Sequence, residues 1–160
     1  MSLITFFFSA QGRIGRMEYW LGLLASIALS MAVSAVVDPG AMNVENGVLQ
    51  PPTLAGTIWN LLITWPSTAI AIKRFNDRDW PYWTGFALGG LMVAMVVANY
   101  FGLLLHPDQM SPLEKLVMVG LVVAFLWSII ENGFNVGTTG ANRYGPDPLS
   151  GRGRGDAIGG

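Results

Sequence analysis

The sequence of 160 residues contains no cysteine, a single histidine and few charged residues. The absence of cysteine excludes disulfides, thiol catalysis and cysteine-ligated metals. Charged residues make up 12% of the chain, whereas about a quarter is usual in a soluble domain. Hydrophobic residues, in contrast, make up 52% of the chain. This composition favours a membrane protein over a soluble globular domain.

Four long apolar runs with almost no internal charge account for this composition. They cover approximately residues 19–37, 53–72, 82–105 and 113–130. At about 1.5 Å per residue, each run forms a helix of roughly 27 to 36 Å, which is enough to cross a hydrocarbon core of about 30 Å. We therefore expect an all-α polytopic membrane protein, built as a four-transmembrane-helix bundle. The alternative is a soluble bundle with buried helices.

The segments outside the runs differ in character. Residues 3–8 are apolar but too few to span a bilayer, and they suit a short N-terminal segment in the membrane interface. The chain from Asn132 onward has nine glycines and two prolines among 29 residues. We therefore expect residues 1–149 to form a single four-span membrane domain, and residues 150–160 to form a flexible, disordered C-terminal tail.

The basic residues are distributed unevenly between the connections of the four runs. Eight of the nine lie before the first run, between the second and third, or after the fourth: Arg13, Arg16, Lys73, Arg74, Arg78, Arg143, Arg152 and Arg154. The other two connections contain only Lys115. Because basic residues near span ends remain in the cytoplasm, this alternation predicts cytoplasmic N- and C-termini. The pattern indicates orientation and gives no sign of nucleic-acid binding.

Polar residues from three segments should meet at the predicted inner face and form a cap. The candidates for this cap are Arg13, Arg16, Glu18, Lys73, Arg74, Asp77, Arg78, Asp79, Asn142 and Arg143. The arginines can pair with these carboxylates and with Glu131 and Asp147, which would make the cap purely structural. Arginine also binds phosphate through two parallel hydrogen bonds, so the functional interpretation is a site for anionic lipid or for a partner protein.

The second run carries the polar residues Asn60, Thr64 and Thr68 at a spacing of four, with Pro66 among them. This spacing places the three side chains on one helix face, where ordinary helix contacts are the simpler interpretation. The alternative function is an oligomeric channel or small-solute transporter that uses this polar stripe, with Pro66 as a hinge. No acid or base lies in the middle of a run, which argues against a proton-coupled pump.

Sequence motifs give no indication of an enzyme. The chain contains no HExxH, P-loop, GxGxxG or GxSxG motif, and His106 is predicted on the outer face, far from the acidic residues. Asp77 and Asp79 could bind a divalent metal, but the adjacent basic residues favour internal ion pairs. An enzyme acting on lipid headgroups is therefore the weakest hypothesis. We expect no catalytic residues, no cofactor and no metal. The expected partners are membrane lipids with anionic headgroups. The sequence leaves open whether the chain forms a homo-oligomer.

The three inner segments read GRIGRMEYW (12–20), IKRFNDRDW (72–80) and NRYGPDP (142–148). Together with the aromatic residues before the first segment, this order resembles the bacterial inner-membrane family labelled domain of unknown function 805, over about residues 5–149. That family often has histidine at the position of Asn76. The resemblance implies a multi-pass protein of the bacterial inner (cytoplasmic) membrane and singles out the arginines, but it assigns no activity.

Overall fold

A computed structural model describes residues 1–40, 44–45, 48–103 and 110–150. Within these ranges the chain is helical apart from one pair of two-residue strands, so the predicted all-α class is confirmed. The elements are α1 (Leu3–Phe8), α2 (Arg16–Val37), β1 (Val44–Glu45), β2 (Val48–Leu49), α3 (Leu54–Asp77), α4 (Trp83–Tyr100) and α5 (Pro112–Gly133). The antiparallel pairing of β1 with β2 gives the connection between α2 and α3 a short hairpin.

Each of the four long helices overlaps one of the four apolar runs of the sequence. Of the helices in the described ranges, α2, α4 and α5 are long and apolar enough to cross a membrane. α3 is the more polar one, because Asn60, Pro66 and several threonines interrupt its apolar residues. The structure therefore supports a membrane protein with three clear candidate spans.

α4 ends earlier than the predicted run of residues 82–105. Its last residue is Tyr100, and Gly102 follows in the left-handed conformation with φ 72°. The N–H of Leu103 donates to the carbonyl of Ala98 at 3.0 Å, which closes the helix as a Schellman motif. The glycine thus ends the helix within the apolar run, and residues 104 and 105 lie outside the described ranges.

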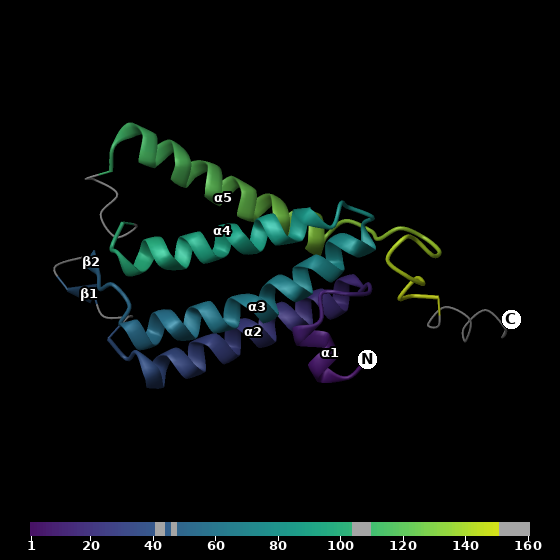
Figure 1. The fold of residues 1–160 in the computed structure, drawn as a ribbon, viewed down its shortest axis with the longest axis horizontal. Helices are drawn as coiled ribbons and strands as arrows, with labels where there is room; N and C mark the ends of the chain where they lie inside the picture. Colours follow the sequence, from purple (N-terminus) through teal and green to yellow (C-terminus); the bar gives the residue numbers. More distant parts are fainter. Residues whose placement is uncertain (41–43, 46–47, 104–109, 151–160) are drawn as a thin grey trace, which may run out of the picture.

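α2, α3 and α4 form a layer in which α3 lies between its two neighbours (Figure 1). α5 meets this layer at one end only, where it contacts α2 and α3, and it diverges from α4 toward the other end (Figure 1). α1 packs against α3 near the end where α5 joins. The loop of residues 134–150 also lies at that end, so the segments that the sequence analysis assigned to one face converge there.

Glycines allow α4 to approach α3 closely. A Cβ atom at Gly85 would lie 2.3 Å from Cγ1 of Ile72, and one at Gly89 would lie 2.5 Å from Cγ2 of Thr68. Contacts this short do not occur for real Cβ atoms, so larger residues would separate the two helices. A Cβ atom at the neighbouring Gly90 would have no contact within 4 Å.

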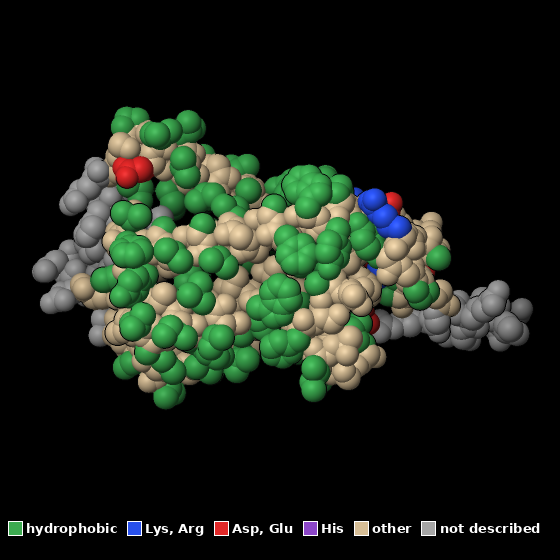
Figure 2. All heavy atoms as spheres, viewed as in Figure 1, with side chains coloured by type: hydrophobic (Ala, Val, Ile, Leu, Met, Phe, Trp, Pro, Cys, Tyr) green, Lys and Arg blue, Asp and Glu red, His purple; other side chains and the backbone are tan. Residues whose placement is uncertain are grey.

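The outer surface of the helices is apolar, whereas the most buried part of the molecule is polar. Green apolar side chains cover the helices in Figure 2, and the basic side chains visible there lie at the end near α1. α5 in particular exposes Leu113, Leu116 and Val119. Conversely, residues 68–77 of α3 are all buried, including Lys73, Arg74 and Asp77. Such a distribution fits a chain surrounded by lipid, with most of its charged residues at one end.

Candidate functional site

The candidate site is a network of buried charged and polar side chains around the C-terminal end of α3, which we call the polar cap. It consists of Arg13, Lys73, Arg74, Asn76, Asp77, Arg78, Glu131 and Asn142, which all form hydrogen bonds to one another or to nearby backbone. Lys73 and Arg74 have no exposed surface. Burial of a charge is costly unless the charge is paired and hydrogen-bonded, so each partner matters for the fold.

Asp77 stands at the centre of the polar cap between two guanidinium groups. Arg13 Nη2 lies 3.0 Å from Asp77 Oδ1, and Arg74 Nη1 forms an ion pair with Oδ2 of the same carboxylate. The side chains of Arg13, Arg74 and Asp77 are 1%, 0% and 4% exposed. Both carboxylate oxygens are therefore engaged, and no part of this triad is open to solvent.

Backbone carbonyl groups accept the remaining hydrogen bonds of the two arginines. Arg13 donates to the carbonyls of Thr138 and Gly140, at 2.6 and 2.7 Å. Arg74 donates to the carbonyl of Asn132 at 2.6 Å and also to that of Asn135. The C-terminal end of a helix favours a cation, so Arg74 stabilises the end of α5. Through these bonds the arginines join α3 to α5 and to the loop of residues 134–150.

Glu131 forms a second junction between α3 and α5. Arg78 Nη2 lies 2.9 Å from its Oε1 atom, and the indole N–H of Trp80 donates to the same oxygen at 2.8 Å. The amide of Asn135 donates to Oε2. A carboxylate with three side-chain donors is well satisfied, and this junction holds α5 to the turn that follows α3.

Lys73 attaches the N-terminal segment to α3. Its ammonium group donates to the carbonyl of Thr5 at 3.0 Å and to that of Phe6, and it lies 5.2 Å from the centre of the Phe6 ring. These carbonyls belong to the end of α1, where a positive charge is favourable. Lys73 therefore fixes α1 against the membrane-facing helices.

Two asparagines complete the attachment of the chain ends. The Asn76 amide donates to the carbonyls of Ala10 and Gly12, at 3.3 and 3.0 Å. The Asn142 amide donates to the carbonyl of Asn76 at 2.9 Å. Asn76 occupies the position where the family that the sequence resembles often has histidine. In this chain its amide donates hydrogen bonds to the backbone that precedes α2.

The remaining predicted cap residues lie on the rim of the polar cap. Arg16 is exposed and donates a long hydrogen bond of 3.3 Å to the carbonyl of Phe134. Glu18 caps α2 by accepting the N–H of Gly15 at 2.9 Å. Arg143 pairs with Asp79 at 2.9 Å, with side chains 54% and 44% exposed. The rim is therefore the part of this end that can meet other molecules.

The loop after α5 is organised by Asp147. The backbone N–H groups of Leu149 and Gly140 donate to its carboxylate at 2.9 and 3.1 Å, which lowers the pKa of Asp147 below its usual value. Gly137 of the same loop was not predicted as part of this site, although its Cα faces the Asp77 carboxylate. Backbone carbonyl groups of a loop, and glycines that lie close to another segment, have no recognisable sequence pattern. The loop of residues 134–150 was therefore not predicted to accept most of the hydrogen bonds of Arg13.

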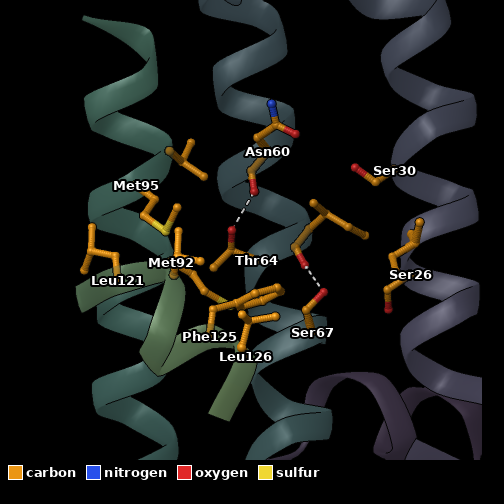
Figure 3. A pocket seen from close by; sticks show the side chains of 14 residues that line it. Ser26, Ser30, Asn60, Thr64, Ser67, Met92, Met95, Leu121, Phe125 and Leu126 are labelled. Atoms are coloured by element: carbon orange, nitrogen blue, oxygen red, sulfur yellow. Dashed lines mark hydrogen bonds between the residues drawn. The ribbon is translucent and has the colours of Figure 1, made fainter. Parts of the chain in front are cut away.

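The predicted polar stripe of α3 is divided between two environments. Asn60 and Thr64 line a cavity of about 370 Å³ between the helices (Figure 3). Thr68 instead packs against Gly89 of α4, and its buried hydroxyl group has no hydrogen-bond partner in the described chain. Thr64 and Thr68 also line a second, smaller cavity between α3 and α4, so the stripe faces two different cavities.

The two aspartates considered as metal ligands form ion pairs, and several other residues named in the sequence analysis lie outside the described ranges. Asp77 and Asp79 pair with arginines, and among the described residues no group of three or more His, Asp and Glu side chains could hold a metal ion. His106, Arg152, Arg154 and the predicted disordered tail after Ser150 lie outside the described residues.

Comparisons with known proteins agree with the motifs of this site. The family described as "Protein of unknown function (DUF805)" matches residues 7–146. The chain is 26% identical over 147 residues to the "Uncharacterized protein YiiR" of Escherichia coli K12 and to the protein of the same name in Escherichia coli O157:H7. Each alignment covers 92% of this chain and 90% of the relative. No solved structure matches the chain.

Proposed function

This chain belongs to the DUF805 family of proteins of unknown function, and we propose that it is a non-enzymatic, four-span protein of the bacterial inner membrane. The polar cap faces the cytoplasm, fixes the helices relative to one another, and presents a basic rim to anionic lipid or to a partner. The observation that carries this proposal is the gathering of the basic residues at one end of an otherwise apolar helical molecule.

The fourth span is α3. It lies between α2 and α4 along its length, so it shares their surroundings although its composition is more polar. Its charged residues all fall in its last two turns, beyond the predicted span of residues 53–72. With Arg13, Arg74 and Arg78 at one end of the helices and Lys115 at the other, the distribution of basic residues favours a cytoplasmic polar cap.

Reporter fusions test the four-span arrangement. We expect fusions after Asp79 and after Ser150 to report a cytoplasmic position, and fusions after Gly40 and after Met110 to report a periplasmic one. The pairing of an alkaline phosphatase reporter with a fluorescent protein gives opposite signals at each position and serves as the internal control. If α3 does not cross the membrane, the fusion after Asp79 will instead report a periplasmic position.

We infer two roles for the predicted cap residues, one for those that are buried and one for those that are exposed. Arg13 and Arg74 are buried, and their guanidinium groups are occupied by Asp77 and by backbone carbonyls. They hold the fold together and are too buried to contact a lipid phosphate. Contact with anionic headgroups is therefore assigned to the rim, where Arg16 is exposed at the start of α2.

Replacement of Arg16 by alanine tests this assignment. Because a basic residue near an anionic surface contributes about 1 kcal/mol, we expect Arg16→Ala to weaken retention of phosphatidylglycerol about fivefold relative to phosphatidylcholine. Native mass spectrometry of the purified protein with defined lipid mixtures gives the ratio. The control is Lys115→Ala, which removes an exposed basic residue from the opposite end. Equal ratios for both variants would remove Arg16 from the lipid-binding role.

An oligomeric channel or small-solute transporter is the second candidate, because Asn60 and Thr64 line a cavity inside the helical layer. It ranks second because Thr68 turns away from that cavity toward Gly89. A lipid-modifying enzyme has less support, since both oxygens of the Asp77 carboxylate are held by arginines and cannot act on a substrate.

A further inference from the structure

The cavity beside Asn60 has one polar and one apolar wall (Figure 3). α2 and α3 contribute serine, threonine and asparagine side chains, whereas α4 and α5 contribute Met92, Met95 and Phe125. None of the lining residues is charged. Its volume of about 370 Å³ falls in the range of roughly 300 to 1,000 Å³ that is typical of small-molecule sites.

A second cavity, of about 450 Å³, extends this space between α4 and the diverging part of α5. Met95 and Leu121 line both cavities, so the two are adjacent. Exposed apolar side chains such as Ile27 and Leu126 flank the first one. A molecule would therefore enter from the lipid phase, and a long apolar chain has room beside the polar wall.

The hydrogen bonds of the polar wall indicate which ligand group fits it. The hydroxyls of Ser26, Thr64 and Ser67 donate to carbonyls of their own helices, at 2.9, 2.7 and 3.1 Å. A hydroxyl has a single proton to donate, so these three groups offer only lone pairs to a ligand. The carboxamide of Asn60 and the hydroxyl of Ser30 form no hydrogen bond with the described chain, and each can both donate and accept. The wall as a whole favours a ligand that donates a hydrogen bond.

We propose that this cavity binds an uncharged lipid-phase alcohol, with its hydroxyl at Asn60 and its hydrocarbon chain against Met92, Met95 and Phe125. An ionised headgroup is excluded because no lining side chain could neutralise it in a low-dielectric site. A ketone or an ether only accepts hydrogen bonds, so it could use the donors of Asn60 and Ser30 but not the lone pairs of the other three hydroxyls. This binding requires neither an oligomer nor lipid at the Arg16 rim, and it goes beyond the function proposed above.

A matched pair of photoreactive probes tests the proposal: hexadecanol and its methyl ether, each with a diazirine on the hydrocarbon chain. Because a net hydrogen bond contributes about 0.5 to 1.5 kcal/mol, we expect the intact protein in nanodiscs to bind the alcohol about two- to tenfold more tightly than the ether. Cross-links should fall on the α4 and α5 segments of residues 92–96 and 121–126. Equal binding of the two probes, or cross-links spread over all helices, would overturn the proposal.

Three variants locate the selectivity. Asn60→Leu removes both a donor and an acceptor that the alcohol can use but only a donor that the ether can use, so it should weaken alcohol binding more than ether binding and narrow the difference between the two probes. Asn99→Leu is the matched control, because Asn99 is half-buried on α4 and does not line the cavity. Ser30→Phe keeps Asn60 but fills the space, so it should abolish binding of both probes. An alcohol preference that is unchanged in Asn60→Leu, or binding that survives Ser30→Phe, would contradict the assignment.

Discussion

Asp77→Asn is expected to lower the free energy of unfolding by about 3 to 5 kcal/mol, the cost of removing one partner from a buried ion pair. Asp77 is the carboxylate shared by Arg13 and Arg74, and all three side chains are at most 4% exposed. An amide at this position preserves the shape but leaves two buried guanidinium groups without a counter-charge. Both cations also repel each other, so the loss falls on the contacts of α3 with the N-terminal segment and with α5.

Asp79→Asn is the matched control for this prediction. It makes the same chemical change two residues later, at an ion pair whose side chains are about half exposed. Exposed pairs contribute only about 0 to 1 kcal/mol, and asparagine tolerates the φ of 58° that Asp79 adopts. Reversible unfolding in mixed micelles, followed by circular dichroism, gives both values. Equal losses for the two variants would show that the Asp77 triad does not stabilise the fold.

The helices, and the position of the charged segments at the same end of those helices, could be predicted from the sequence because both depend on local patterns. Apolar runs of sufficient length form helices in lipid, and the alternation of Arg and Lys residues between connections depends on chain order alone. The sequence also limited the partners of Arg13, Arg74 and Arg78 to a few carboxylates on the same face. The part of the chain that the family model matches, residues 7–146, includes Arg13, Arg74 and Asp77.

Which arginines are buried could not be predicted, because burial depends on contacts between distant segments. Arg13 and Asp77 are 64 residues apart, and Arg13 meets Thr138 after a further 61. Its other acceptors are backbone carbonyls, which every residue possesses and no motif marks. The sequence thus gave Arg13, Arg74 and Arg16 the same status. In the structure Arg13 and Arg74 are internal supports, and Arg16 is the one exposed to the surroundings.

Gly137→Ala is expected to destabilise the protein by about 2 to 3 kcal/mol, although the residue lies in the loop after α5. A Cβ atom at this position would lie 1.9 Å from Asp77 Oδ2 and 2.6 Å from Cγ. Asp77 cannot move aside without losing Arg13 or Arg74. Displacement of the loop instead would break the hydrogen bond of 2.8 Å from the Thr138 N–H to the Asp77 carbonyl.

A double-mutant cycle separates this collision from a general effect of alanine in the loop. In an Asp77→Ala background the colliding carboxylate is gone, so Gly137→Ala should cost at least about 1 kcal/mol less than in the wild-type protein. Thr139→Ala is the control, because Thr139 is exposed in the same loop and its replacement should change stability by no more than about 0.5 kcal/mol. The same unfolding measurement in mixed micelles gives the free energies of the four proteins of the cycle and of the Thr139→Ala control. Strict additivity of Gly137→Ala and Asp77→Ala would mean that the glycine is required for some reason other than the close approach of the loop to Asp77.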